Sequence, residues 1–339
     1  MYHITPLTQY FISNTQLFNL EDNNINNKNS FSYKYYELIY HLYYKKQNSK
    51  IIDAYSPTDF LDYIQNADPS SFIANKINDP KKLFYFIIQN LKKELNKKEN
   101  IKNLENSSNI GISIQTNNDS LQLFKKFLNN FKFTNNSIID NYFAGIKCNV
   151  ITCQNCNEID YSFKEFYSIN FILSKIENSI GQNKKITLDK CFEFYYNKEK
   201  SIINDNSKNI CKKCSKSVFS CYKQIYLSPK ILVIIIDDVT KKGNLFKLKN
   251  EIDINDYLIE KNEGYQLIGL VTYFKEKGMN EQYISYCKSN IDGKWYCCYD
   301  DCIYEVKEPE PQNDMEGKNR QPYILFYIEK NINFNNWIN

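Results

Sequence analysis

The sequence predicts an α+β fold. Apolar residues in the first third of the chain recur at three- and four-residue spacings, as on one face of a helix. From about residue 145 onward they alternate with polar residues, as in half-buried strands. Hydrophobic residues make up 42% of the 339 residues, which is enough for a sizeable core. Helices followed by a run of strands, with no internal repeat, are typical of α+β domains.

The first third is expected to contain three helices. Apolar residues between 35 and 43 form one stripe of a first helix. A second helix should start at Ser56-Pro57-Thr58-Asp59, with Ser56 as its cap and Pro57 in its first turn. A third should start at Asn78-Asp79-Pro80 and continue as a strongly amphipathic segment that ends in lysines, which suits the helix dipole.

Strands dominate the later part of the chain. Before them, residues 96–120 are rich in Asn, Ser and Lys, and they predict a mobile surface loop. Thr187 is expected to cap a short helix over residues 188–196. The predicted strands cover residues 159–163, 167–173, 218–227, 231–236, 265–273, 282–287, 294–299 and 323–328.

Composition and charge exclude several classes of protein. A net charge of +4 creates no field that argues for nucleic acid or an acidic membrane. No apolar run approaches the roughly 20 residues of a membrane-spanning helix, and the first residues lack the pattern of a signal peptide. Eleven cysteines are an odd number, in a chain too long to need a disulfide scaffold. We expect an intracellular protein, in the cytoplasm or nucleus, with reduced thiols.

Two Cys-x2-Cys pairs carry the clearest chemical signal: Cys153 with Cys156, and Cys211 with Cys214. Two such turns supply four thiolates, about 2.3 Å from a tetrahedral Zn²⁺. Four protein ligands leave no position for water, so the zinc would be structural. Chance pairing in a cysteine-rich chain is one alternative. A thioredoxin-like redox pair is another, although one motif would suffice for it and no βαβ pattern surrounds either motif.

The remaining cysteines lie on apolar or strand-like stretches and are expected to be small buried side chains. They are Cys148, Cys191, Cys221, Cys287, Cys297, Cys298 and Cys302. A cysteine nucleophile needs a nearby base, and the chain contains only His3 and His41. His41 lies beside the apolar stripe of the first helix, where packing or surface exposure is the simpler role. A catalytic pair built from these residues is disfavoured.

A series of motifs resembles, in order, those of the ubiquitin-specific proteases. Phe143-Ala-Gly leads into the first cysteine pair, and Thr187-Leu-Asp-Lys-Cys precedes the second. Leu227-Ser-Pro-Lys-Ile-Leu, Tyr265-Gln-Leu-Ile-Gly-Leu-Val and Tyr323-Ile-Leu-Phe-Tyr continue the match. Each motif alone is modest, but their order and spacing cover nearly the whole chain.

The resemblance implies the papain-like cysteine-protease superfamily and a hand-shaped domain. A helical thumb, truncated at its N-terminus, would span 1–144, zinc-binding fingers 145–225 and a β-rich palm 226–330. Ubiquitin or a ubiquitin-like protein would rest on the fingers and palm, with its C-terminal tail between thumb and palm. The family cleaves the bond after that tail with a Cys nucleophile, a His base and an orienting Asp or Asn.

The catalytic positions depart from the family pattern. The nucleophile's Asn-x-Cys box would precede Met1, because the residues from Tyr2 onward resemble those that follow the box. The base belongs to a Gly-His-Tyr triplet that aligns with Glu281-Gln282-Tyr283, while Asp300 matches the orienting acid. A glutamine amide takes no proton near neutral pH, and losing general acid–base help costs about 10²–10⁴-fold in rate. Asp300 alone can orient nothing.

Two other positions differ in charge from the family. Lys82 stands where the family has Glu, and Asp238-Val239 stands where it has Arg-Phe. Both are further departures from the family pattern.

Three functional hypotheses follow. The first is a catalytically inactive member of the family that binds ubiquitin or acts as a scaffold. The second is an active ubiquitin carboxyl-terminal hydrolase whose Cys box lies outside this chain, and Gln282 weighs against it. The third is a zinc-stabilised adaptor in a larger intracellular assembly, such as an RNA-processing complex. The basic clusters Lys92-Lys93 and Lys97-Lys98 are compatible with the third, although a solvated helix end is the simpler explanation and nucleic acid is not an expected direct ligand.

Overall fold

The computed structural model of the chain describes residues 27–48, 56–73, 78–96, 117–181, 184–196, 201–204, 210–238, 246–276, 278, 280–289, 292–299, 302–311, 314 and 317–332. His3 and Asp300 from the sequence analysis lie outside these residues, and so does the predicted loop between 97 and 116.

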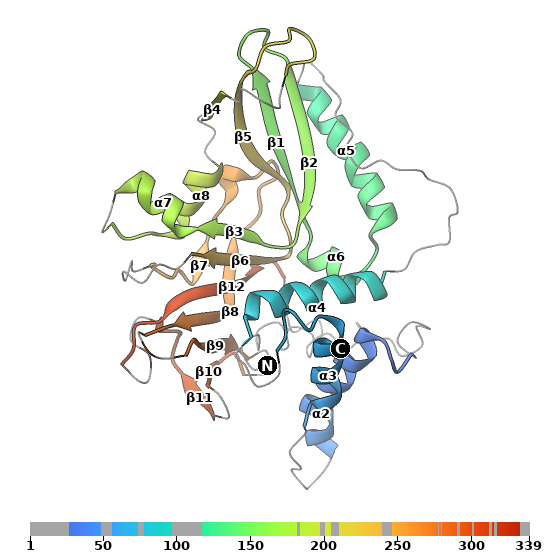
Figure 1. Cartoon of the computed structure of the whole chain (residues 1–339), viewed down its shortest axis with the longest axis vertical. Coiled ribbons are helices and arrows are strands. Elements are labelled where there is room, and N and C mark those ends of the chain that lie inside the picture. The colour runs from blue at the N-terminus through green and yellow to red at the C-terminus, as the bar shows by residue number, and fades with distance from the viewer. Residues whose placement is uncertain are drawn as a thin grey trace.

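The predicted α+β class is confirmed, because helices α2 to α6 precede every strand. They lie in the lower centre and on the right of Figure 1, with the larger sheet at the lower left and the smaller one at the top. The helices are α2 (Phe31–Asn48), α3 (Thr58–Ala67), α4 (Pro80–Glu94), α5 (Asn117–Thr134) and α6 (Ile138–Phe143). No helix in the described ranges is both long enough and apolar enough to cross a membrane.

The strands form two sheets. The smaller sheet has four antiparallel strands, in the order β2 (Ile159–Phe166), β1 (Gly145–Cys153), β5 (Val218–Leu227) and β4 (Ser201–Asn204). The larger sheet runs in the order β11 (Cys302–Val306), β10 (Trp295–Tyr299), β9 (Gln282–Lys288), β8 (Tyr265–Phe274), β12 (Gln321–Glu329), β6 (Ile231–Asp237) and β3 (Ile169–Ile172). Its eighth strand, β7 (Glu251–Ile252), pairs with β8, and only β3 and β6 pair in parallel.

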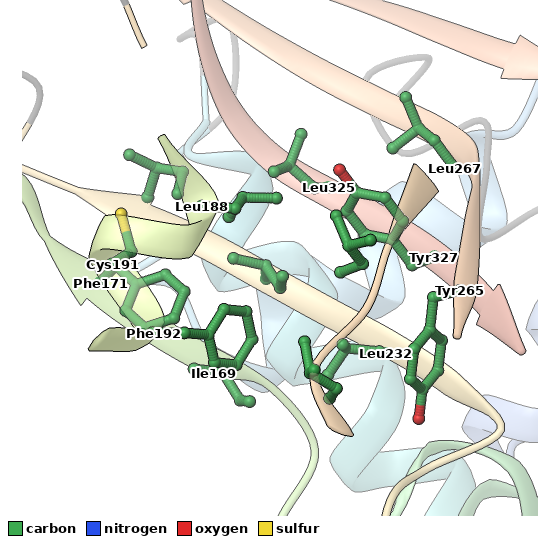
Figure 2. Packing of buried hydrophobic residues seen from close by; sticks show 14 of the residues in the cluster. Ile169, Phe171, Leu188, Cys191, Phe192, Leu232, Tyr265, Leu267, Leu325 and Tyr327 are labelled. Atoms are coloured by element: carbon green, nitrogen blue, oxygen red, sulfur yellow. The ribbon is translucent and has the colours of Figure 1, made fainter. Parts of the chain in front are cut away.

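Both faces of the larger sheet are covered. Successive side chains of a strand point to opposite faces, so alternate residues of β6 enter two separate clusters. Val233 packs with residues of α2, α3, α4 and α6, whereas Ile234 packs with residues of α7 (Leu173–Ile180) and α8 (Leu188–Tyr196). Figure 2 shows the second cluster, in which Phe171 and Phe192 meet beside Leu232. This double burial explains why β6 reads as one apolar run.

All three predicted helix starts are confirmed, and two of the three have the predicted cap. Asp79 caps α4 by accepting the Lys81 N–H at 2.8 Å, with Pro80 in the first turn. Thr187 precedes α8, and its hydroxyl accepts the Lys190 N–H at 3.4 Å. The predicted cap of α3 is wrong, because Pro57 itself occupies the cap position and no side chain bonds there.

Other elements were not predicted. Helix α5 begins at Asn117, inside the predicted loop 96–120, so residues 117–120 are helical. The short helix α7 follows β3 directly, and β11 forms the edge of the larger sheet. The boundaries of the expected fingers stay a prediction. Within residues 145–225, β3, α7 and α8 pack with the larger sheet rather than with the smaller one.

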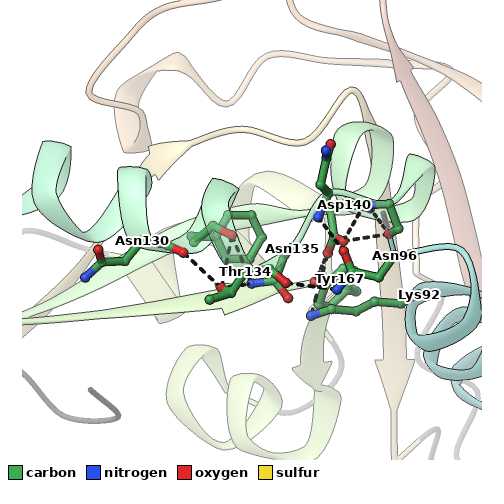
Figure 3. A network of polar contacts seen from close by, with 10 residues as sticks. Lys92, Asn96, Asn130, Thr134, Asn135, Asp140 and Tyr167 are labelled. Carbon is green, nitrogen blue, oxygen red and sulfur yellow. Dashed lines mark hydrogen bonds and ion pairs between the residues drawn. The ribbon is translucent and has the colours of Figure 1, made fainter. Parts of the chain in front are cut away.

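A buried carboxylate joins α4, α6 and the end of β2. Asp140 closes a capping box with Ser137 at the start of α6, and its Oδ1 accepts the Tyr167 hydroxyl at 2.6 Å. Lys92 Nζ lies 3.6 Å from the same carboxylate and 4.6 Å from the centre of the Tyr167 ring (Figure 3). Lys92 therefore forms an ion pair inside the fold, and its charge does not add to a solvent-exposed basic cluster with Lys93.

Candidate functional site

The four predicted zinc ligands converge at the far end of the smaller sheet, at the top of Figure 1. All four sulfurs lie within 4.8 Å of one another. Cys153 and Cys214 are 3.5 Å apart, and so are Cys156 and Cys211. A tetrahedron with Zn–S bonds of about 2.3 Å has edges of about 3.8 Å, close to these separations. The short contacts run between the two motifs and not within either, which disfavours a redox pair in one motif.

The two cysteine turns repeat one backbone pattern. In each turn the carbonyl of the first cysteine accepts an N–H four residues on, from Asn157 at 2.9 Å or from Ser215 at 2.8 Å. Each first cysteine also donates to the carbonyl five residues on, at 2.8 and 2.9 Å. Asn157 and Ser215 have φ of 57° and 56°, in the left-handed region. Two distant segments thus adopt one strained turn, and both present their thiols to one point.

Backbone N–H groups favour thiolates in the second cysteine turn. In the first turn, the backbone hydrogen bond of Cys156 is outweighed by burial and by contacts with the other thiols, which raise the pKa of Cys156 to about 12. A backbone N–H of Lys216 lowers the pKa of Cys214 to about 7, and backbone N–H groups of Cys214 and Lys213 lower that of Cys211. An ion pair from Lys213 Nζ to Glu158, at 3.0 Å, links the two turns. Metal ligands must be deprotonated, so this donor set fits a cation that prefers sulfur, such as Zn²⁺.

The other cysteines are mostly buried, as expected. Five of the seven are buried and all are free of disulfide bonds, while Cys221 and Cys302 are half-buried. Burial raises the pKa of Cys148 and of Cys191 to about 12, so neither thiol is activated at neutral pH.

The residue expected at the base position, Gln282, begins β9 and is half-buried. Strand alternation places Gln282 on the same face of the larger sheet as Ile284 and Tyr286, which pack with residues of α7 and α8. Tyr283 lies on the opposite face, which packs with residues of α2, α3, α4 and α6. Its Oε1 accepts a hydrogen bond from Arg320 Nη2 at 3.4 Å. The side chain at the position where the base is expected is therefore hydrogen-bonded to a guanidinium.

Arg320, which contacts Gln282, was not singled out by the sequence reasoning. Its side chain is fully buried, and its Nε donates to the buried carboxylate of Asp314. The guanidinium carbon lies 5.4 Å from the centre of the Phe274 ring and 5.6 Å from that of Tyr299. One signal was present, because Arg320 is the only arginine in a chain with 43 basic residues. A flat guanidinium stacks on rings and binds carboxylates in ways that lysine does not.

The start of α4 meets the larger sheet through polar contacts. Lys81 Nζ pairs with Asp237 at 2.5 Å, and the Tyr323 hydroxyl donates to Asp79 at 2.8 Å. The Tyr323 ring also lies 5.8 Å from Tyr283. Burial, and next the charge of Asp79, raise the pKa of both tyrosines, so both hydroxyls remain proton donors at neutral pH.

The charge reversals expected at positions 82 and 238 lie beside this contact. Lys82 and Asp238 are both exposed, and the ion pair between α4 and β6 is made by their neighbours. Asp300, the expected orienting acid, lies outside the residues that the structure describes.

A helical unit packed on a mixed sheet, with a second sheet carrying four clustered cysteines, defines a deubiquitinase-type fold. A family model described as "Ubiquitin carboxyl-terminal hydrolase" matches residues 1–327, and the chain belongs to this family. It is 28% identical over 173 residues to Ubiquitin carboxyl-terminal hydrolase 12 of Saccharomyces cerevisiae, a match that covers 46% of this chain but only 13% of that relative.

A solved structure shares the fold. It is the SAGA DUB module that contains Ubp8, Sgf11, Sus1 and Sgf73, and it superposes with a TM-score of 0.64 at 16% identity. The superposition covers 98% of this chain and 68% of that one. At this identity the likeness shows the architecture alone.

Proposed function

We propose that this chain is a catalytically inactive member of its family that binds ubiquitin or a ubiquitin-like protein and acts as a binding or scaffolding module in the cytoplasm or nucleus. The observation that carries the proposal is the Gln282 carboxamide, whose oxygen accepts from the buried Arg320. A carboxamide is too weak a base to accept a proton near neutral pH, so it gives no general-base catalysis. A guanidinium beside it also disfavours a second positive charge at that position.

Recognition does not need the lost chemistry. A ubiquitin tail is an extended chain, and backbone groups with a few polar side chains are enough to hold one. Asp79 and Tyr323, which are half-buried and bonded to each other, would supply such groups where the thumb-like helices meet the palm-like sheet. From the family resemblance, we assign residues 1–144 to the thumb, 145–225 to the fingers and 226–330 to the palm.

A structural zinc ion completes the proposal. Cys153, Cys156, Cys211 and Cys214 would hold it, and it would cross-link the turn after β1 to the turn before β5. Such an ion supplies folding free energy, not chemistry. Scaffolding within a larger protein complex is a role that an inactive, zinc-stabilised domain can fill.

Two measurements on the purified chain test the proposal. We expect mono-ubiquitin to bind in a calorimetric titration, and no fluorophore to be released from a ubiquitin C-terminal conjugate above the rate of a zinc-stripped control. Release of the fluorophore, or labelling of a thiol by a ubiquitin C-terminal electrophile, would establish the active-hydrolase alternative, and both assays are repeated on a chain extended upstream to include any Asn-x-Cys box. Absence of ubiquitin binding, together with absence of release, would leave the zinc-stabilised adaptor.

The Gln282→His variant sharpens the test. We expect no gain in release, because the Cys box would still be absent from this chain and Arg320 would still lie against the introduced side chain. A measurable gain would show that only the imidazole was missing, and that the remaining catalytic groups are in place.

A further inference from the structure

One face of the smaller sheet is already occupied by α5. The Phe124 ring lies 5.9 Å from that of Phe163 on β2 and 5.2 Å from that of Tyr226 on β5, and the Phe127 ring lies 5.8 Å from Phe163. Val150 of the central strand joins the same cluster. Figure 1 shows α5 running along this sheet. A partner that touches the sheet itself therefore has to use its other face.

That other face carries three adjacent lysines. Lys147 on β1 is directly opposite Lys164 on β2. Lys223 on β5 is opposite Asn149, the next residue of β1 on the same side. Because side chains alternate, these residues point away from Val150 and from α5. Neighbouring strands lie about 4.8 Å apart, so the three lysine side chains start from adjacent positions on one face.

Aromatic rings support two of these lysines. Lys147 Nζ lies 5.9 Å from the centre of the Phe166 ring, and Lys223 Nζ lies 5.7 Å from that of Tyr195 on α8. The Phe166 ring rests on Gly145, where a Cβ would come within 2.3 Å of it, so only glycine permits this arrangement. The surface is thus a built one, with apolar rings beneath the charges.

The positive charge of this face is not neutralised within the described part of the chain. Neither Lys147, Lys164 nor Lys223 forms an ion pair there, whereas nine other basic residues do. Among the described strand residues of this face the one acid is Asp160. It lies opposite Ile151, two same-face pairs from Lys147–Lys164 toward the cysteine cluster. Burial, then Lys223 and Lys164, lower the pKa of Lys147, which shows that the lysines repel one another.

We propose that the face formed by Lys147, Lys164 and Lys223, here called the basic face, docks a short acidic segment of a protein partner. Complementary charge is the first reason, since a carboxylate-rich segment relieves the repulsion among the lysines. The half-buried Tyr195 ring adds apolar contact for a side chain between the acids, while Phe166 is buried beneath Lys147. A polyanion such as RNA fits less well, because the whole chain carries a net charge of only +4 and the patch holds three charges.

Fluorescence anisotropy on the full chain tests this docking. The probe is a labelled peptide of glutamates interspersed with tyrosines, and its partner probe has glutamines in place of the glutamates. We expect the acidic peptide to bind, the neutral one not to bind, and the affinity to fall as salt rises, since exposed charges are screened within about 10 Å at 0.1 M salt. Failure of the acidic peptide to bind at low salt would overturn the proposal.

Charge-reversal variants locate the contact. The triple variant Lys147→Glu/Lys164→Glu/Lys223→Glu should weaken peptide binding by about tenfold or more. Its matched control changes the net charge equally on α5, with Lys125→Glu/Lys126→Glu/Lys132→Glu, all of which are exposed. The control variant should bind the acidic peptide as the wild type does. An equal loss of peptide affinity in both triple variants would show that overall net charge, and not the basic face, determines binding, and would overturn the proposal.

Two further measurements keep the result clear. Lys164 is exposed, so the single Lys164→Glu variant should fold normally and still bind several-fold more weakly. Tighter binding of a short single-stranded RNA than of the acidic peptide to the basic face would overturn the proposal and identify the ligand as nucleic acid. Mono-ubiquitin is titrated against the same triple variant, because these lysines lie within the expected fingers. Loss of peptide binding with ubiquitin binding retained supports a separate docking site, whereas equal loss of both would make the basic face part of the expected ubiquitin surface and overturn the proposal.

Discussion

Removing the charge of Asp314 is expected to destabilise the protein severely. Asp314 and Arg320 form a fully buried ion pair, so Asp314→Asn leaves a guanidinium in the core beside a neutral amide. Removing one partner of a buried pair costs about 3–5 kcal/mol. With an unfolding entropy of about 2.1 cal/mol/K per residue over 339 residues, each kcal/mol lowers Tm by about 1.4 °C. We therefore expect Tm to fall by about 4–7 °C.

A double-mutant cycle separates the free-energy cost of the unpaired buried charge from other effects of the substitutions on stability. Asp314→Asn, Arg320→Met and the double variant are compared by calorimetric unfolding. The double variant should recover much of the loss, because methionine replaces the buried cation with an apolar chain. Asp59→Asn is the control, since Asp59 is 70% exposed and its pair with Lys34 should contribute less than about 1 kcal/mol. A Tm for Asp314→Asn within about 1 °C of the wild type, or a double variant no better than either single one, would refute the reasoning.

Three further predictions concern the cysteine cluster, α5 and alkaline pH. Elemental analysis should find one zinc per chain, and Cys156→Ser should lose the zinc and much of the thermal stability, while Cys302→Ser keeps both. Phe124→Ala should cost about 3–5 kcal/mol in urea unfolding, and Phe133→Ala, at a site 52% exposed, should cost little. Burial raises the pKa of Tyr226 from 10.0 to about 12, so its stabilising effect is complete below pH 10 and is lost as pH rises through 12. Tyrosinate absorbance should therefore increase together with loss of circular dichroism in that range.

The sequence predicted those features that depend on local chemistry. The cysteine cluster was predictable because Cys-x2-Cys turns orient their thiols through backbone hydrogen bonds within six residues. The start of α4 was equally local, since Asp79 and Pro80 determine it by themselves. Strand β6 was recognisable because burial on both faces requires an unbroken apolar run.

The features that were missed depend on contacts between distant segments. The start of α5 has the polar composition of a loop, and the helix is stabilised by phenylalanines that pack on strands of the smaller sheet. Ser56 was expected to cap α3, but the chain enters that helix through Pro57. The pairing of Arg320 with Gln282 joins residues 38 positions apart, and no local pattern announces it.

The neighbourhood of Arg320 also predicts how an imidazole would titrate at the base position. Gln282→His should give an imidazole with a pKa below its ordinary value of about 6.5, because burial and the guanidinium both disfavour the imidazolium. Adding Arg320→Met removes the cation and should raise that pKa again, and NMR titration of the imidazole protons measures both values. His41, which both variants share, serves as the internal reference. Equal pKa values in the two variants would show that Arg320 does not control the charge at position 282, and the physical argument for lost catalysis would then depend on the amide alone.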